Sequence, residues 1–348
     1  MGSAYSENII GDNTVNSTSN NNTTQKKFNA DATSLTISES TTLSTNASQT
    51  VNIFRKNNGT VTVESGSSIF SNGASSSNTI QGRTQSGLTV TNSGTINAGG
   101  SKAINLLNAT NSIITNNTGG IIKSNTNTIT VTATNDNDAN NVTINNSGEI
   151  YAYSTDPAAD SAAIKSEDDT DNITIINNSG GYIHNNNDNE NAFQGSTVFV
   201  SAVSTATFTN SGTIENKAGV DGFALGLNGS GVTVNLKDKG KVIGKINVAG
   251  SGHTIKLQHG AGQAYFYETT GDGTYDLEDL DGNPVVKGSA GSIGQGGNEM
   301  LDETLSYKSL NMRKSLIRFK QSEAYLNQDE WGEFFTTFNK RKENKSTL

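Results

Sequence analysis

Residues 91–98 read TNSGTINA, and variants of this stretch recur along the chain. The shared pattern is asparagine, a small residue, glycine, any residue and then isoleucine or valine. The other copies are NNGTVTV at 57–63, NNTGGIIK at 116–123, NNSGEIYA at 145–152, NNSGGYIH at 177–184, TNSGTIEN at 209–216 and, in degenerate form, KDKGKVIG at 237–244. Their glycines are Gly59, Gly94, Gly119, Gly148, Gly180, Gly212 and Gly240. The spacing averages about 30 residues, which is typical of repeat architectures.

Short alternating runs precede the motif in most copies: LTV at 88–90, VTI at 142–144, ITI at 173–175, ATF at 206–208 and VTV at 232–234. This alternation places the apolar side chains on one face of a β-strand. A third apolar run lies further upstream, at 103–106, 162–164 and 224–227. Each unit therefore predicts a strand, a turn, a second strand, an Asn-Ser-Gly turn and a short third strand.

One such unit cannot bury its own apolar face, but stacked units can, because each covers the next. We therefore expect an all-β fold, a right-handed parallel β-helix (β-solenoid), with a narrow column of Ile, Val and Leu inside. Triangular β-solenoids of other kinds are the alternative. At about 30 residues a turn, residues 30–260 would give roughly eight turns. We expect Asn and Gly at the corners because they adopt the left-handed backbone that Ile and Val avoid. Equivalent corner asparagines are expected to hydrogen-bond in ladders.

The composition agrees with a thin core and excludes several classes of protein. The 348 residues include 47 Asn, 43 Thr and 39 Ser, and hydrophobic residues make up 32%. Such polarity would also fit a disordered chain, but disorder favours high charge, and charged residues are only 16% here. The absence of cysteine excludes disulfides, and no apolar run is long enough for a membrane-spanning helix. The net charge of −9 argues against a nucleic-acid partner, which needs a basic stripe.

Composition also divides the chain into five expected segments. Residues 1–28 are polar without a period and predict a flexible lead-in, and residues 29–287 predict the β-helix. A Gly-rich linker follows at 288–298. Residues 299–330 carry spaced apolar side chains among Lys and Arg and predict an amphipathic helix. Residues 331–348 predict an aromatic strand and then a basic tail.

Few residues offer metal-binding chemistry. His253 and His259 are six residues apart on a strand-like stretch, so both could face one side as zinc ligands. Surface histidines are nevertheless favoured, and His184 is expected to face solvent. The acidic run at 272–281 matches a calcium loop at only three positions, so a solvated turn is favoured there. We therefore expect no metal ion and no cofactor.

The sequence also lacks an enzyme-like constellation. No Gly-x-Ser-x-Gly elbow lies near a plausible His and Asp. Polysaccharide lyases on β-helices cluster Asp, Arg and Lys in a groove, whereas Arg55 and Arg83 are the only arginines before residue 290 here. We expect no catalytic residues. Tyr151, Tyr153 and Tyr182 follow or lie within corner motifs and are candidate surface contacts for a sugar or a protein. Partial packing of these rings against loops is the alternative.

The Asn-Ser-Gly-x-Ile repeats, followed by a linker, a helix and a Trp-Gly strand, resemble a bacterial type V autotransporter with a passenger of the AIDA-like adhesin type. The resemblance covers residues 52–342. It implies a right-handed β-helical passenger that is secreted across the outer membrane and displayed on the bacterial cell surface. It also implies that the helix, over 299–327, lies in the pore of a membrane barrel. The first barrel strand would then begin at Trp331, Phe334, Phe335 and Phe338.

The chain departs from the complete family pattern at both ends. The opening MGSAY lacks the basic and apolar regions of a signal peptide, and the barrel would stop after at most one strand. The chain is therefore expected to be an excised passenger with a truncated translocator, which would not insert into a membrane by itself.

The resemblance implies an adhesin without enzymatic activity. Its partners would be a host-cell surface protein or glycan, or identical passengers on neighbouring cells, held by many weak contacts along a rigid rod. Two alternatives stay open: a β-helical polysaccharide-degrading enzyme, and a structural stalk for a missing binding head.

Overall fold

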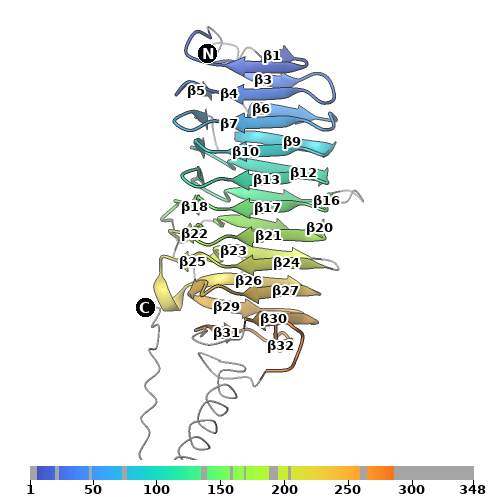
Figure 1. Cartoon of the computed structure of the whole chain (residues 1–348), viewed down its shortest axis with the longest axis vertical. Coiled ribbons are helices and arrows are strands. Elements are labelled where there is room, and N and C mark those ends of the chain that lie inside the picture. Colours follow the sequence, from blue (N-terminus) through green and yellow to red (C-terminus); the bar gives the residue numbers. More distant parts are fainter. Residues whose placement is uncertain are drawn as a thin grey trace, which may run out of the picture.

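The computed structural model describes residues 6–19, 23–46, 49–72, 77–134, 139–156, 160–167, 170–187, 195–202, 205–258 and 265–285. These residues form a tall stack of parallel β-strands (Figure 1). The expected linker at 288–298, the helix at 299–330 and the aromatic strand at 331–348 lie outside the described residues, as does His259.

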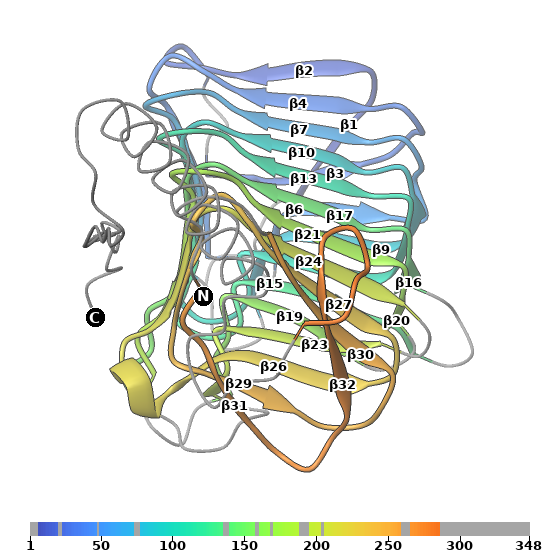
Figure 2. The same cartoon turned by 60° about the horizontal axis from the view of Figure 1, so that its bottom comes forward.

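Three parallel sheets, which we call A, B and C, make up the stack (Figure 2). Sheet A contains 11 strands: β1 (Ser6–Ile9), β3 (Gln25–Phe28), β6 (Gln49–Phe54), β9 (Asn78–Ser86), β12 (Ile104–Thr110), β15 (Ile129–Thr132), β19 (Ile164–Glu167), β23 (Val198–Ala202), β26 (Phe223–Gly229), β29 (Lys245–Val248) and β31 (Glu268–Thr270). Sheet B also contains 11 strands: β2 (Asp12–Val15), β4 (Ser34–Ile37), β7 (Thr60–Val63), β10 (Thr89–Asn92), β13 (Ile113–Asn116), β17 (Thr143–Asn146), β21 (Ile173–Asn177), β24 (Ala206–Asn210), β27 (Val232–Leu236), β30 (His253–Leu257) and β32 (Tyr275–Asp279).

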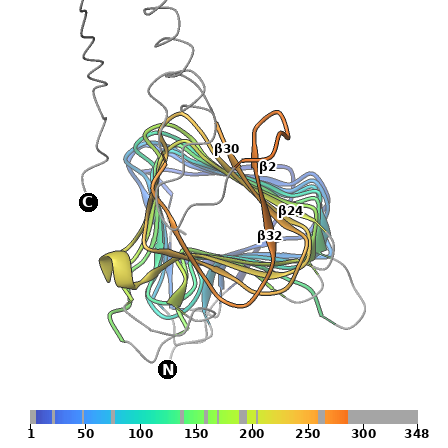
Figure 3. The same ribbon diagram turned by 90° about the horizontal axis from the view of Figure 1, so that it is seen from below.

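Sheet C contains eight strands: β5 (Thr42–Thr45), β8 (Ser68–Ser71), β11 (Thr95–Ala98), β14 (Ile121–Ser124), β18 (Glu149–Ala152), β22 (Tyr182–Asn185), β25 (Thr213–Asn216) and β28 (Lys241–Ile243). On eight successive turns, from β3 to β28, the chain visits A, B and C in that order, so the predicted parallel β-helix with three strands per unit is confirmed. Figure 3, which looks along the stack, shows successive turns superposed. The remaining elements are the short pair β16 (Ala139–Asn140) and β20 (Thr170–Asp171) and the one-turn 3-10 helix η1 (Gly219–Asp221).

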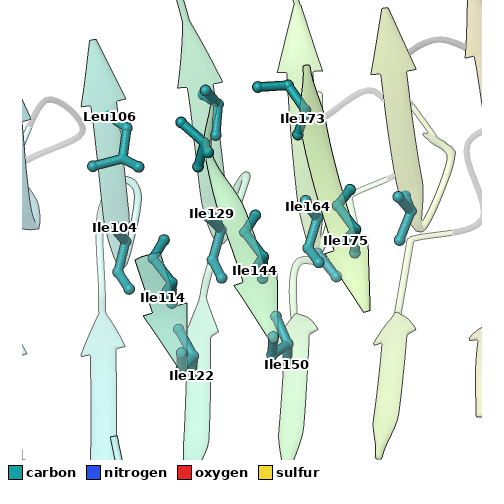
Figure 4. Close-up of a cluster of buried hydrophobic side chains, with 14 of the residues drawn as sticks. Ile104, Leu106, Ile114, Ile122, Ile129, Ile144, Ile150, Ile164, Ile173 and Ile175 are labelled. Atoms are coloured by element: carbon teal, nitrogen blue, oxygen red, sulfur yellow. The ribbon is translucent and has the colours of Figure 1, made fainter. Parts of the chain in front are cut away.

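The core is a column of stacked aliphatic side chains, because in-register parallel strands place equivalent residues above one another. Ile104, Ile129 and Ile164 are register partners in sheet A. Ile114, Ile144 and Ile175 are register partners in sheet B, and all six are buried (Figure 4). Full burial of one such side chain stabilises the fold by about 1.5–3 kcal/mol. Only a few such side chains from each turn fill the narrow column, which explains the low apolar content of the chain.

One expectation about the extent of the helix is wrong. Within the predicted flexible lead-in at 1–28, residues 6–9, 12–15 and 25–28 form strands β1, β2 and β3. The physical reason is burial: Ile9, Val15 and Phe28 point into the core. The roughly eight turns expected over residues 30–260 are confirmed, and the stack continues beyond that range at both ends, so sheets A and B have 11 strands each.

Polar groups close both described ends of the column. In the N-terminal turns Lys26 is buried and forms an ion pair with Glu7 on the neighbouring strand. In the last turn the buried carboxylate of Asp279 accepts hydrogen bonds from the backbone N and the Nδ2 of Asn283, both at 2.8 Å. A solenoid needs ends of this kind, since an apolar face left open would stack on another molecule.

Candidate functional site

At the corner between sheets B and C, five successive sheet B strands end in a buried asparagine: Asn92, Asn116, Asn146, Asn177 and Asn210. The Nδ2 of each of the first four donates a hydrogen bond to the Oδ1 of the next asparagine, at 2.8–2.9 Å, and the Nδ2 of Asn210 donates to Lys241 O at 3.0 Å. The same Nδ2 groups donate to backbone carbonyls of the corner, for example Asn146 to Gly148 O at 3.1 Å. The expected asparagine ladder is confirmed. It ties each turn of the chain to the next and holds the corner closed.

The corner glycines serve two different purposes. At Gly94, Gly148 and Gly212 an added Cβ would lie 2.2 Å from a backbone carbonyl oxygen of the preceding turn. At Gly240 the corresponding distance, to Asn210 O, is 2.4 Å. None of these four has a positive φ. They are glycines because the backbones approach closely, so the left-handed backbone predicted for them is wrong.

The left-handed backbone is confirmed at Gly119 and Gly180, whose φ angles are +81° and +84° and whose Cβ position is open space. In these two copies the corner is longer, and Gly120 and Gly181 make the close approach instead, 2.6 and 2.7 Å from carbonyl oxygens. Gly59 is not equivalent to the others, because it precedes β7 of sheet B and a Cβ there would meet the ring of Phe28 at 3.0 Å.

On the solvent side of sheet C, the structure brings two of the predicted tyrosines together with His184 on β18 and β22, the strands at the left of the stack in Figure 1. Tyr151 stacks on His184 with ring centroids 4.5 Å apart, and His184 stacks on Tyr182 at 4.4 Å. Lys123 lies 5.8 Å from the centre of the Tyr151 ring. We call this surface, with Glu149, Glu215 and Lys217, the aromatic platform.

Tyr153 lies beside the platform. Its ring meets the edge of the Tyr151 ring at 6.3 Å, and its hydroxyl donates to Ala98 O at 3.0 Å. Burial and the nearby Tyr151 raise the pKa of Tyr153. All three tyrosines are partly exposed. The rings are thus partly packed against neighbouring groups, as one of the two expectations has it, and their role as contacts for a sugar or a protein stays a prediction.

His184 does not face solvent as expected, because the rings of Tyr151 and Tyr182 cover both of its faces. Its Nε2 lies 2.9 Å from Glu149 Oε1. Burial lowers the pKa of His184 and outweighs the opposing effect of Glu149. The imidazole is therefore neutral at pH 7 and donates its Nε2 proton to the carboxylate.

His253 is also buried rather than exposed. Its Nδ1 accepts a hydrogen bond from the backbone N of Val232 at 3.3 Å, and its Nε2 donates to Ala249 O at 2.9 Å. Both partners are backbone groups, so this side chain joins neighbouring turns. Its place in the structure is that of a core residue, not of a surface histidine.

Beside the stacked rings, Tyr182, Glu215 and Lys217 form a hydrogen-bonded network. The Tyr182 hydroxyl donates to the Glu215 carboxylate, and Lys217 contacts both, with its Nζ 3.0 Å from Glu215 Oε2. Burial raises the pKa of Tyr182, and the bond to Glu215 raises it further. Burial alone would raise the pKa of Glu215, but its two donors lower it below the ordinary value. At pH 7 the network therefore holds a neutral phenol between a carboxylate and an ammonium.

Sequence reasoning missed Glu149, Glu215 and Lys217, and it missed the contact between Tyr151 and His184, for which a signal exists. When the copies at 145–152 and 177–184 are aligned on their second glycine position, Gly148 matches Gly181, and Tyr151 then matches His184. Alignment on the first glycine shifts the register by one residue and separates these side chains.

Within the described residues, no helix has the length and apolar character needed to cross a membrane. The same residues hold no group of three His, Cys, Asp or Glu placed to bind a metal ion. No protein-family model, no curated protein and no solved structure matches the chain. What can be said of function thus rests on the fold and on the aromatic platform.

Proposed function

We propose that this chain is a surface-displayed β-helical rod of the autotransporter-passenger kind, and that it acts as an adhesin through the aromatic platform on sheet C. The observation that carries the proposal is the stack of Tyr151, His184 and Tyr182, held between two carboxylates and two lysines. Tyrosine and histidine rings with polar tips suit contact with sugars and proteins, because they present apolar surface and hydrogen-bonding groups together. The partner is a host-cell glycan or protein, or another copy of the rod.

The platform is rigid before any partner binds. His184 is fixed by two stacking contacts and one hydrogen bond, and Tyr182 by its bonds to Glu215 and Lys217. Side chains that are already ordered lose little conformational entropy on binding, so more of the contact energy contributes to affinity. A long stack of such turns also supports contact at several points, which adds avidity.

The protonation states favour binding over catalysis. A β-helical lyase needs a base whose pKa lies near the working pH. The pKa of Tyr182 is raised by burial and by Glu215, which keeps the phenol protonated. We therefore propose an adhesin without enzymatic activity. Release of new reducing or unsaturated ends from a polysaccharide by the purified chain, abolished by E149Q or E215Q, would contradict this.

The direct test displays the protein on cells and measures attachment to host cells and settling of the culture. Replacing Tyr151 and Tyr182 with alanine should weaken attachment by about tenfold or more, because aromatic contacts commonly dominate interfaces. The matched control is Phe70→Ala, an outward aromatic residue of sheet C further along the same register. Equal attachment by the tyrosine variant and the control would show that the rod is only a stalk.

The autotransporter origin has its own test. The reading frame around this chain should encode a signal peptide upstream and a membrane β-barrel of alternating amphipathic strands downstream of a pore helix at 299–330. A right-handed winding of the passenger belongs to the same proposal, since parallel strand connections are almost always right-handed. A stop codon directly after Leu348 in the native gene would exclude this origin while leaving the platform experiment unaffected.

A further inference from the structure

A second aromatic feature lies far from the platform, at the end of β6 in sheet A. The ring of Phe54 is 40% exposed although it belongs to a large apolar side chain. The guanidinium carbon of Arg55 lies 4.9 Å from the ring centroid, and that of Arg83 lies 5.7 Å from it. Arg83 reaches this ring because it is the register partner of Phe54 on β9. Both arginines of the described chain therefore converge on one exposed phenylalanine.

The two guanidinium groups carry charge that no carboxylate of the described residues neutralises within 4.0 Å, whereas Lys26, Lys165 and Lys256 all have acidic partners. Arg55 and Arg83 are exposed. The chain as a whole has a net charge of −9. Two unpaired cations at one point of an acidic rod create a local positive potential, which attracts anions from solution.

The backbone beside these arginines adopts the left-handed conformation. Arg55, Thr84 and Asn108 are stacked on successive turns, and their φ angles are +53°, +49° and +51°. A β-branched residue such as threonine rarely takes this left-handed conformation, and glycine would take it without strain. Such strained positions gather at ligand sites more often than elsewhere.

We propose that Phe54, Arg55 and Arg83 form a binding site for an anionic saccharide, with a carboxylate or sulfate group of the sugar held by the two arginines. A guanidinium that stacks on an aromatic ring keeps its N–H edge free, and that edge matches a carboxylate or sulfate in a two-pronged hydrogen bond. The exposed part of the ring supplies the apolar surface against which the C–H face of a sugar packs. A nucleic acid is disfavoured because two arginines do not make the basic stripe that a polyanion requires.

The test measures binding of three tetrasaccharides to the full chain by calorimetry: a heparin-derived one that carries sulfate, an oligogalacturonate that carries only carboxylate, and a neutral cellulose fragment. We expect one or both anionic probes to bind and the neutral probe not to bind. The stronger of the two anionic probes identifies the group that the arginines prefer. Binding of all three with equal affinity, or of none, would overturn the proposal.

Variants distinguish binding at this site from a general effect of the net charge of the protein. R55A/R83A should weaken anionic binding by about tenfold or more, since both charge-assisted hydrogen-bond donors are removed. The matched control K239A/K241A removes the same charge from exposed lysines elsewhere and should change the affinity less than about twofold. Equal losses in both double variants would reduce the effect to net charge and contradict the site.

Two further variants test how the site would hold the sugar. R55K/R83K keeps the charge but loses the planar fork, so we expect a loss of several-fold; unchanged affinity would argue against paired arginine recognition. F54A should weaken saccharide binding while leaving thermal stability nearly unchanged, because the ring is exposed. Equal binding of a tetraglutamate peptide would assign the site to acidic peptides and overturn the saccharide proposal. Because the platform tyrosines are intact in all these variants, the outcome is independent of the proposed adhesin function.

Discussion

The last buried position of the sheet B strands is apolar in the first three turns of the stack, at Val15, Ile37 and Val63, and an asparagine in the next five. The register is continuous through both regions. One column of the core is thus filled first by hydrocarbon and then by amides. Hydrocarbon side chains contribute burial and tolerate many neighbours, whereas buried amides contribute only when their N–H and C=O groups find hydrogen-bond partners.

The two regions therefore differ in how strictly the sequence is constrained. In the apolar turns any branched aliphatic residue fills the column. In the amide turns each asparagine depends on its neighbours, and Asn92 at the boundary shows the cost: its buried Oδ1 has no hydrogen-bond partner, because Val63 precedes it. The following four experiments are directed at this difference.

The largest effect is expected at the corner glycines of the amide turns. Gly148→Ala places a Cβ 2.2 Å from Gly120 O and should lower the free energy of unfolding by at least about 3 kcal/mol, because the backbone itself must move. Gly119→Ala, where the space is open and only φ is unfavourable, should cost about 1–2 kcal/mol. Urea unfolding measures both, and an equal cost would contradict the distinction between close approach and left-handed backbone.

Asn146→Val gives the amide region the residue that stands naturally at position 63. It removes the acceptor of Asn116 Nδ2 and the donor to Asn177 Oδ1. Asn116 Nδ2 keeps its bonds to Gly120 O and Glu149 O, but the buried Asn177 Oδ1 loses its donor, which costs about 1–3 kcal/mol. We therefore expect a destabilisation of about 2 kcal/mol despite the added apolar surface. The control Val63→Ile should change stability by less than about 1.5 kcal/mol. A neutral Asn146→Val would mean that the ladder adds no stability.

The reverse exchange moves an amide into the apolar region. Val63→Asn would place a donor beside the unpaired Oδ1 of Asn92, whereas Ile37→Asn would place an amide between Val15 and Val63. We expect the first variant to be more stable than the second by about 2 kcal/mol, because only the first gains a partner. Thermal unfolding followed by circular dichroism compares the two, and equal stability would count against the ladder explanation.

The smallest effect concerns pH. Amides do not titrate, so neither region of the column responds to acid, whereas His184 on the outer face does. Its pKa is lowered in the folded state from the ordinary value of 6.5, so the unfolded chain binds a proton first. The contribution of neutral His184 to the stability of the fold is complete above pH 6.5. It declines as the pH falls from 6.5 through the lowered pKa of the folded state. His184→Gln should remove the decline between pH 7 and 5; an unchanged profile would place the sensitivity elsewhere.

The same contrast explains what the sequence predicted. Sheet B and C strands from residue 88 onward were predicted because the ladder asparagine, the corner glycine and the Thr-alternating strand stand together in one visible motif. Residues 6–28 lack the asparagine, so the sequence predicts a flexible lead-in there, although their core positions are equally buried. Burial by branched aliphatic residues leaves no distinctive motif, because many residues satisfy it.

The sequence predicts the candidate site only in part, and the reason is related. The tyrosines are visible in the sequence as aromatic residues beside a corner, but the burial of His184 depends also on Tyr151, which belongs to the preceding turn. Their contact depends on the register of β18 against β22, which the extra residue at Gly181 sets. Local sequence contains no information about that neighbour until the turns are aligned.

The ladder has one more property, which is its direction. Four amide–amide bonds connect Asn92 to Asn210, and in each of them the N-terminal asparagine donates and the C-terminal one accepts. Five amide dipoles therefore point the same way along the rod, and hydrogen-bonded amides in such a chain polarise one another and strengthen the next bond. A turn that has already formed offers an oriented N–H group to the turn that follows it. The stack thus contains a template for its own growth, with a defined starting end at Asn92 and a defined finishing end at Asn210.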